Sequence, residues 1–233
     1  MSSNPFNHDA AQNSGYLYST NASLSSQLAN QRLTDLTLEA LALRGKTVLD
    51  IGCGDGVYTR AIEQLGQPKT IIAGDVAEEA VHVAQRNSNG QNVRYVINSA
   101  YELPFAEKAF EIALLRGVLH HLDQPQKALG EALRVAQTVW VIEPNGYNPG
   151  LKLLEKLSPY HIAHGEKSYP PHQLDAWIAQ LGGSVTSRKW AGFVPMFCPN
   201  LIACLMKALE PLVEHTPLVS RIASAVYVFK AAR

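Results

Sequence analysis

Short apolar runs alternate with helical patterns along most of this 233-residue chain. Within each run nearly every residue is apolar, so neither side of the segment is marked as facing water. Strands with this composition are buried on both faces, as in parallel sheets that are covered by helices on both sides. The alternation therefore predicts an α/β fold. We expect strands at 47–51, 70–74, 93–97, 110–115, 138–142 and 225–229, and helices at 23–43, 57–65, 78–85, from 125 onward and at 174–181.

Both ends of the chain depart from this pattern. Residues 1–21 are polar, and we expect them to form a flexible arm or lid ahead of one domain at 22–233. Apolar residues at helical spacing from Leu201 to Val213, and a second short helix near Pro217, predict a helical cap inserted at about 194–222. We expect the apolar stripe of this insertion to pack as core or as the roof of a pocket. The last strand should then close the sheet at its edge.

Composition excludes several classes of protein. Lysine and arginine together number 20, as do aspartate and glutamate, so binding of nucleic acid through its phosphates has no compositional support. Three cysteines without a CxxC pair disfavour a disulfide framework or a zinc cluster. No segment has the apolar core of a signal peptide or the length of a stable membrane span. We therefore expect a soluble, cytoplasmic protein with no nucleic-acid partner.

A glycine-rich turn, Gly52-Cys-Gly-Asp-Gly56, follows the first predicted strand. Open parallel sheets bind ligands beyond the carboxyl ends of their strands, and glycines let the backbone approach a ligand closely. Asp50 and Asp55 would repel a diphosphate here, and Val57 replaces the third glycine of the dinucleotide-binding pattern. Two carboxylates suit a ligand that carries an ammonium and a sulfonium. Asp55 is equally suited to stabilise the N-terminus of the next helix.

Polar residues also follow the second and third predicted strands. Asp75 lies directly after the second strand and about 20 residues beyond Gly54, the spacing at which an acid typically accepts hydrogen bonds from ribose hydroxyls. Val76 is then placed to pack on the face of a nucleobase. The polar turn 98–105 is placed to hold the edge of that base.

Jointly and in this order, these motifs resemble the class I S-adenosylmethionine-dependent methyltransferases, in particular their type 11 branch. The resemblance covers roughly residues 22–145 and implies a Rossmann-like, mostly parallel seven-stranded sheet with helices on both faces. It implies that S-adenosyl-L-methionine is the cofactor and S-adenosyl-L-homocysteine the product, with in-line transfer of the methyl group to a small-molecule acceptor. The matching segments are Val48-Leu-Asp-Ile-Gly-Cys-Gly-Asp-Gly56, Gly74-Asp-Val76, Glu102-Leu-Pro-Phe105 and Phe110-Glu-Ile-Ala-Leu-Leu-Arg-Gly-Val-Leu-His-His-Leu122.

The resemblance also implies roles for individual residues. In the family, the first motif holds the amino-acid part of the cofactor, the acid after the second strand holds ribose, and the segment after the fourth strand lines the methionine part. Ser99 stands where many relatives have an aspartate that accepts from the adenine amino group, so its hydroxyl or the backbone of Ala100 and Tyr101 would take that role. Tyr18 is a candidate lid residue. The expected cofactor-binding residues are Asp50, Gly52, Cys53, Gly54, Asp75, Val76, Ser99, Ala100, Tyr101, Leu115, Arg116 and Tyr18.

The sequence identifies no definite catalytic base. Displacement at a sulfonium needs alignment and exclusion of water, and a base only when the nucleophile must lose a proton. For a hydroxyl acceptor the first candidates are His120, His161 and Tyr147. An oxygen, nitrogen or carbon nucleophile, an apolar acceptor and any oligomeric state all fit the sequence. The alternative functions are a cofactor-binding protein without transfer activity and, against the charge of the turn, a nicotinamide-dependent oxidoreductase.

The histidines do not predict a metal site. His120 and His121 are adjacent, and neighbouring residues on a helix point about 100° apart, so they would not share one ion. His161, His164 and Glu166 lie close together in the sequence, but nothing nearby completes a coordination shell. We therefore expect no metal.

Overall fold

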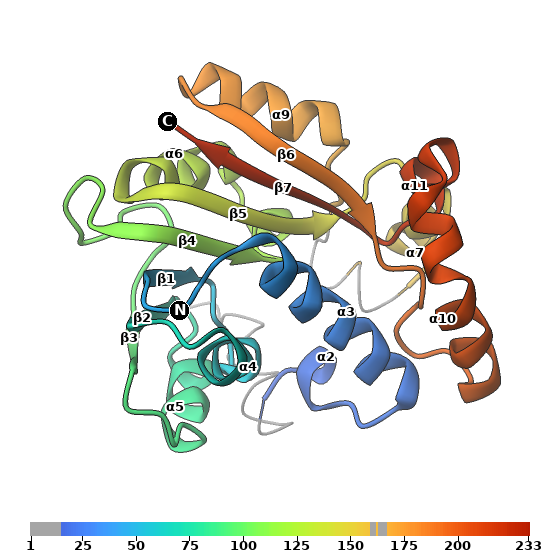
Figure 1. The fold of residues 1–233 in the computed structure, drawn as a ribbon, viewed down its shortest axis with the longest axis horizontal. Coiled ribbons are helices and arrows are strands. Elements are labelled where there is room, and N and C mark those ends of the chain that lie inside the picture. The colour runs from blue at the N-terminus through green and yellow to red at the C-terminus, as the bar shows by residue number, and fades with distance from the viewer. Residues whose placement is uncertain (1–14, 159–161, 163–166) are drawn as a thin grey trace.

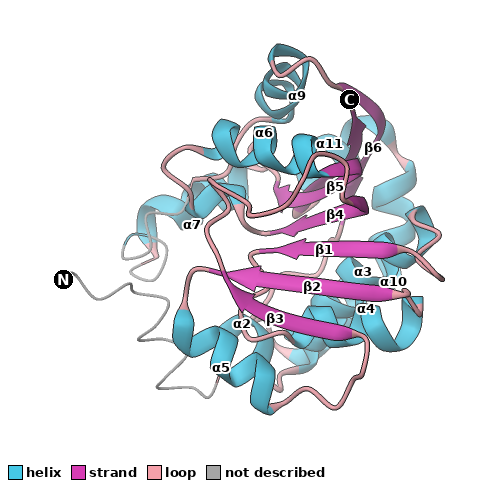
Figure 2. Ribbon diagram, turned by 90° about the vertical axis from the view of Figure 1, so that its left-hand side faces the viewer, coloured by secondary structure: helices cyan, strands magenta, loops and turns pink. Residues whose placement is uncertain are grey.

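The apolar runs of the sequence form one sheet, whose strands lie side by side in Figure 2. The computed structural model describes residues 15–158, 162 and 167–233. The order of the seven strands is β3-β2-β1-β4-β5-β7-β6. Their bounds are β1 (Thr47–Ile51), β2 (Thr70–Asp75), β3 (Val93–Ile97), β4 (Phe110–Arg116), β5 (Ala136–Pro144), β6 (Ser184–Ala191) and β7 (Val226–Ala232).

The order of the strands reverses in the middle of the sheet. From β1 the chain moves outward to β2 and β3, and β4 then returns to pair with the other side of β1. Strands β1 to β5 pair in parallel, whereas β7 is antiparallel to both β5 and β6. Ligands of open α/β sheets bind at such a reversal, beyond the carboxyl ends of the strands.

Helices cover both faces of this sheet (Figures 1 and 2). Successive residues of a strand point to opposite faces, so each strand contributes to two apolar layers. Val48 and Leu114 pack in the layer under α3, α4 and α5, whereas Leu49 and Leu115 pack in the layer under α6 and α9. The predicted Rossmann-like α/β fold is confirmed. The described helices are α2 (Leu17–Thr20), α3 (Leu24–Ala40), α4 (Val57–Gly66), α5 (Glu78–Arg86), the 3-10 helix η1 (Leu119–His121), α6 (Pro125–Val135), α7 (Pro149–Leu157), α9 (Pro171–Gln180), α10 (Asn200–His215) and α11 (Pro217–Ala223).

The positions of the last two strands differ from the expectation. The last strand, β7, does not lie at the edge but between β5 and β6. The edge strand is β6, which the alternation of apolar runs did not predict because most of its side chains are polar and exposed. Helix α7 was not predicted either.

The inserted segment forms α10 and α11, but its apolar stripe does not pack as core or roof. Leu201, Leu205 and Leu212 are exposed, whereas Glu210 is buried. The expected packing is therefore wrong, and the polarity of α10 is reversed relative to a usual surface helix, which turns its apolar side to the core. None of the described helices is both long enough and apolar enough to cross a membrane.

The arm predicted at residues 1–21 is described only in part. Residues 1–14 lie outside the described residues, and residues 17–20 form α2, which contacts α3. The division into an arm and a domain at 22–233 stays a prediction.

Candidate functional site

The glycine turn lies at the carboxyl end of β1, beside the reversal in strand order. The amides of Gly52 and Cys53 donate to the carbonyl oxygen of Gly74, which ties the turn to the end of β2. Gly54 has a φ of +53°, and a Cβ at this position would lie 2.5 Å from the ring of Tyr16. Only glycine fits this backbone conformation and this contact without strain. Burial raises the pKa of the Cys53 thiol, so this cysteine is a small packing residue and not an activated nucleophile.

Asp50 places a buried carboxyl group beneath the turn. The hydroxyl of Thr59 donates to Asp50 Oδ2 over 2.6 Å. Burial raises the pKa of Asp50 to about 6, although the Thr59 hydrogen bond and the charge of Arg116 oppose the rise. A cation bound nearby would favour the ionised carboxylate and lower this pKa.

Asp75 ends β2 beside the same turn. Its two carboxylate oxygens accept from the amides of Gly54, over 2.9 Å, and Ala77, over 2.8 Å. Burial raises the pKa of Asp75, and the backbone hydrogen bonds oppose this rise. The neighbouring Val76 is 62% exposed. An acceptor carboxylate and an exposed apolar side chain thus lie next to each other at the end of β2, and their roles toward ribose and base stay predictions.

The turn after β3 presents a polar side chain, Asn98, that is not among the expected site residues. A Cβ on Gly74 would lie 2.2 Å from Asn98 Oδ1, so the amide of Asn98 lies directly over the end of β2. Its buried Nδ2 has no hydrogen-bond partner among the described residues. Ser99 Oγ, by contrast, accepts from the amide of Tyr101 within the turn. Asn98 is therefore the free donor of this turn.

Tyr101 and Ala100 have structural roles in the same turn. The hydroxyl of Tyr101 accepts from the amides of Asp123 and Gln124, and so links the turn to the start of α6. Ala100 packs against the core layer on that face.

At the end of β4, Arg116 is partly buried and forms no ion pair within the described part of the chain. Its Nη2 donates to Asn30 Oδ1 over 2.6 Å, and its guanidinium lies 4.3 Å from the centre of the Tyr58 ring. Burial lowers the pKa of Arg116, and the nearby Tyr58, Asp50 and Asp55 oppose this shift. The preceding Leu115 packs in the core. This guanidinium is suited to receive a carboxylate from a ligand.

A buried glutamate organises the segment after β4. Glu143, near the end of β5, accepts from the amides of Val118, Leu119 and His120 over 2.8–3.2 Å. His120 Nδ1 lies 2.8 Å from the same carboxylate. Gly117 has a φ of +65°, a conformation that favours glycine, and a Cβ there would meet His120 Cε1 only at an ordinary contact distance of 3.5 Å. The carboxylate thus fixes both the path of the loop and the orientation of the imidazole.

The other two catalytic candidates lie further along the chain. The hydroxyl of Tyr147, just beyond β5, lies 2.7 Å from His172 Nδ1, and the two rings stack with centroids 5.9 Å apart. His161 lies outside the described residues, as do His164 and Glu166. The residues that the structure describes contain no group of three or more potential metal ligands.

The N-terminal segment closes one side of the glycine turn. Asp55 accepts from the amide of Tyr16 over 2.9 Å and from the hydroxyl of Ser19. The ring of Tyr16 lies on Gly54 and packs beside the start of α5. Tyr18, which the sequence suggested as the lid residue, lies instead against Phe197, with ring centroids 5.6 Å apart. Asp55 also accepts from the amide of Val57 in the first turn of α4, so it serves both the helix and the segment above it.

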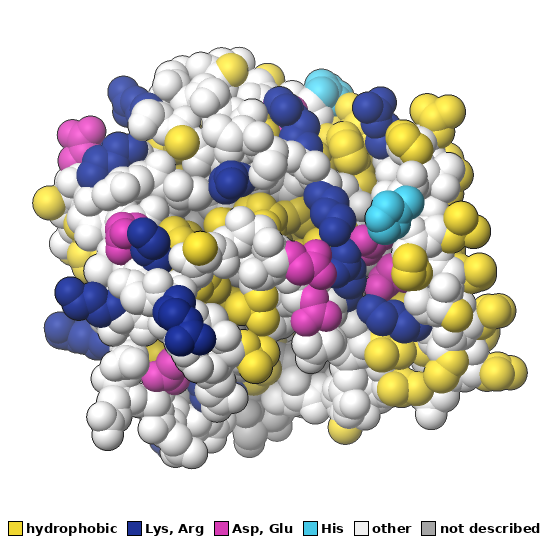
Figure 3. Space-filling view, viewed as in Figure 1, with side chains coloured by type: hydrophobic (Ala, Val, Ile, Leu, Met, Phe, Trp, Pro, Cys, Tyr) yellow, Lys and Arg dark blue, Asp and Glu magenta, His cyan; other side chains and the backbone are white. Residues whose placement is uncertain are grey.

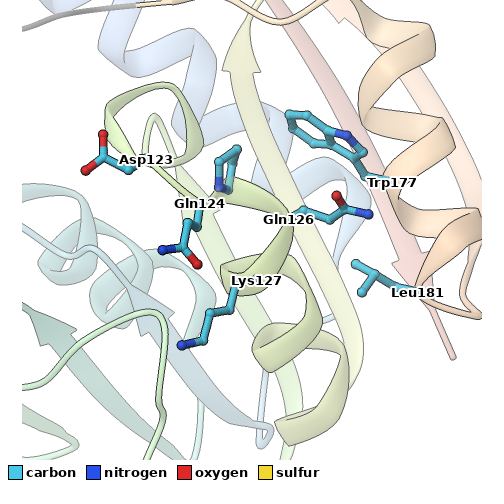
Figure 4. A pocket seen from close by; sticks show the side chains of 7 residues that line it. Asp123, Gln124, Gln126, Lys127, Trp177 and Leu181 are labelled. Carbon is cyan, nitrogen blue, oxygen red and sulfur yellow. The ribbon is translucent and has the colours of Figure 1, made fainter.

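An open hollow between α6 and α9, with a volume of about 450 Å³, is shown in Figure 4. Its lining includes Lys127, Trp177 and Leu181, and none of the expected cofactor-binding residues. The site described above is therefore defined by its hydrogen bonds at the strand ends and not by this hollow.

The central part of the chain is similar to known methyltransferases. Residues 49–138 match the family model described as a methyltransferase domain. An uncharacterized methyltransferase of Mycobacteroides abscessus is 34% identical over 133 residues, which is 51% of either chain. A ubiquinone biosynthesis O-methyltransferase of Pseudomonas fluorescens is 28% identical over 169 residues, covering 63% of this chain and 68% of the relative. The chain thus matches about half the length of the first relative and about two thirds of the second.

Solved structures share the complete fold at low sequence identity. A chain from the complex of the Haloferax volcanii Trm112 methyltransferase activator with a methyltransferase superposes with a TM-score of 0.72 at 15% identity, covering 97% of this chain and 96% of that one. The magnesium protoporphyrin IX methyltransferase of Synechocystis, solved with bound S-adenosylhomocysteine (SAH), has a TM-score of 0.64 at 14% identity, covering 91% and 89%. At these identities the likeness concerns the fold alone.

Proposed function

We propose that this chain is a class I S-adenosylmethionine-dependent methyltransferase, which transfers the methyl group of that cofactor to a small-molecule acceptor. The observation that carries the proposal is the distribution of charge at the end of β1 and β4. Two carboxyl groups with raised pKa values, Asp50 and Asp75, lie at the glycine turn, and the partly buried Arg116 forms no ion pair among the described residues. An ammonium, a sulfonium and a carboxylate on one ligand would satisfy all three groups, whereas a diphosphate would meet two acids.

The residues at the strand ends fit the parts of this cofactor. Asp75 would hold the ribose hydroxyls, and the unpaired amide of Asn98 would donate to the nucleoside beside it. Asp50 would favour the ammonium of the amino-acid part, and Arg116 its carboxylate. Gly52 and Gly54 would let the backbone approach, because a side chain on either would collide with its neighbours.

Bound S-adenosylmethionine supplies a methyl group on a positively charged sulfur, and the neutral thioether S-adenosylhomocysteine is an excellent leaving group. The task of the protein is therefore to align the acceptor with the methyl carbon and sulfur, and to exclude water. Tyr16, held over Gly54 by the contact of its amide with Asp55, would close the nucleotide side of the site. Water would otherwise compete with the acceptor.

We place the acceptor beyond the ends of β4 and β5, near α7. The segment there carries the His120–Glu143 pair, and α7 exposes Leu153, Leu154 and Leu157. These apolar side chains favour an acceptor with an apolar part. A hydroxyl on that acceptor could lose its proton to His120, whose orientation Glu143 fixes, so an O-methyl transfer uses the residues present.

The test measures formation of S-adenosylhomocysteine with a panel of apolar phenols, alcohols, amines and carbon acids. We expect product with a hydroxyl acceptor. Asp75→Asn should raise the KM for S-adenosylmethionine at least about tenfold, because the amide carries no charge and offers one acceptor oxygen in place of two. Glu78→Gln, on the exposed first turn of α5, should leave kcat and the KM for S-adenosylmethionine unchanged. Tight binding of the cofactor without product from any acceptor class would instead favour a binding protein without transfer activity.

A further inference from the structure

Helix α10 turns its apolar side to solvent. Leu201 is 83% exposed, Leu205 61% and Leu212 67%, and they follow one another along one side of the helix. Figure 3 shows hydrophobic side chains gathered along the right-hand margin of the molecule, where α10 and α11 lie in the view of Figure 1. The exposed aliphatic residues of the two helices are Leu201, Ile202, Leu205, Leu209, Leu212, Leu218, Val219 and Ile222. We call this set the α10–α11 face.

Buried charges on the other side of α10 fix this orientation. Glu214 accepts from Arg32 of α3, with Nη2 at 2.6 Å, and from the amide of Gly192 at 2.9 Å. Glu210, one turn earlier, accepts from the amide of Phe193 at 3.0 Å. Turning α10 to bury its leucines would break these contacts and leave Arg32 without its main partner. The outward face is therefore specified by the sequence and is not a consequence of loose packing.

The size of the face exceeds what a monomer normally exposes. Eight aliphatic side chains, each 39–83% exposed, present an apolar area on the order of 800 Å². The largest apolar patch of a typical monomer covers about 300–600 Å², whereas a standard stable interface buries about 800 Å² per partner. The area matches one side of a protein interface.

The distribution of charge favours a second copy of this chain over an anionic membrane. The exposed residues of α10 between Leu201 and Leu212 include no charged side chain. Around a twofold axis each residue approaches its own counterpart, so a stripe without charges avoids repulsion between like groups. A membrane-binding helix usually adds a cluster of basic residues, but Lys207 of α10 forms an ion pair with Glu210.

We propose that the α10–α11 face is a twofold interface between two copies of this chain. Two antiparallel copies of α10 would pack across their midpoint, with Leu205 and Leu209 beside the small side chains of Cys204 and Ala208, which are also exposed. Small residues at the crossing let helix axes approach to about 8–10 Å. The two α11 helices would extend the contact into a four-helix layer. This interface does not depend on the proposed catalytic function.

The oligomeric state of the full-length protein tests this interface. Light scattering after size exclusion should give a dimer for the wild type. Leu205→Glu and Leu212→Glu should each raise the dissociation constant at least about 100-fold, because each dimer would bury two unpaired charges. Leu65→Glu is the matched control, since Leu65 of α4 is 59% exposed but lies outside the face, and it should leave the dimer intact. Circular dichroism and thermal unfolding check that all variants stay folded.

A second measurement uses the cysteine that the face already carries. In a Cys198→Ser background, a short bismaleimide should link two copies through the exposed Cys204, because Cys53 is buried. Cys204→Ser should abolish this product. A wild-type monomer at every concentration, a dimer that both glutamate variants leave intact, or binding to anionic vesicles by a protein that stays monomeric would each overturn the proposal.

Discussion

Replacing Glu143 should release the segment that follows β4. In Glu143→Ala the amides of Val118, Leu119 and His120 lose their shared acceptor, at a site where Glu143 is 1% exposed. Each unsatisfied buried amide costs about 1–3 kcal/mol, and water entering the space left by the side chain recovers part of that cost, so we expect a loss of about 4 kcal/mol. At about 2–4 °C per kcal/mol for a chain of this size, Tm should fall by roughly 8–16 °C.

The more conservative Glu143→Gln separates charge from shape. Its remaining oxygen can still accept from Val118 and Leu119, but its NH₂ group would face the amide and the Nδ1 of His120. We expect a loss of about 2 kcal/mol, half that of the alanine variant. If His120 is the base, loss of the carboxylate that orients its imidazole should also lower kcat for a hydroxyl acceptor.

Thermal unfolding followed by circular dichroism measures these changes, with Glu102→Gln as the control. Glu102 is an exposed glutamate in the neighbouring turn, and its replacement should change stability by no more than about 0.5 kcal/mol. If both Glu143 variants unfolded at the temperature of this control, the carboxylate would not hold the loop. The positioning role assigned to it would then be wrong.

Three further predictions concern the cofactor side of the site. The pKa of Asp50 is about 6 in the folded protein and about 3.9 in an unfolded chain. The stability that its protonated form contributes is therefore complete below pH 4 and is lost as the pH rises through 6. Asp50→Asn should raise Tm by several degrees at pH 8 and by less at pH 5, and should weaken the binding of S-adenosylmethionine in calorimetry. Gly54→Ala should lower the free energy of unfolding by about 1–2 kcal/mol in denaturant titration, since the φ of Gly54 is positive and a Cβ would meet the ring of Tyr16. A Tyr16→Ala background should recover part of that loss, and strictly additive effects of the two changes would contradict the contact. Asn98→Ala should weaken the binding of S-adenosylhomocysteine about tenfold with little change in Tm, because its side-chain nitrogen has no hydrogen-bond partner among the residues that the structure describes; unchanged affinity would remove Asn98 from the site.

Local pattern was sufficient for the central sheet and the glycine turn. The run 47–51 became β1 with the predicted bounds, because Val48, Leu49 and Ile51 are buried on the two faces of the sheet. Asp75 ends β2, at the edge of the sheet where its carboxylate accepts from the amides of the neighbouring turns. Edge strand β6 leaves no such signal, because most of its side chains face water.

The spacing of apolar residues in the sequence could not predict contacts between distant segments. Arg116 is held by Asn30, 86 residues earlier, and Tyr16 lies on Gly54 with its amide bound to Asp55, 39 residues later, so no periodicity predicts either contact. The predicted orientation of α10 was also wrong, because the prediction assumed that an apolar stripe faces the core. What reversed it was the long-range pairing of Arg32 with Glu214, which only the folded chain brings together.

The most direct test of the account is titration calorimetry of the purified protein with S-adenosylhomocysteine and, separately, with NAD⁺. The product nucleoside carries the same ribose, ammonium and carboxylate as the cofactor, so it should bind one molecule per chain, and Asp75→Asn should weaken it at least about tenfold. NAD⁺ should give no binding, because its diphosphate would meet Asp50 and Asp55 at the glycine turn. Saturable binding of NAD⁺ together with no binding of S-adenosylhomocysteine would contradict the assignment of this crevice to a sulfonium nucleoside.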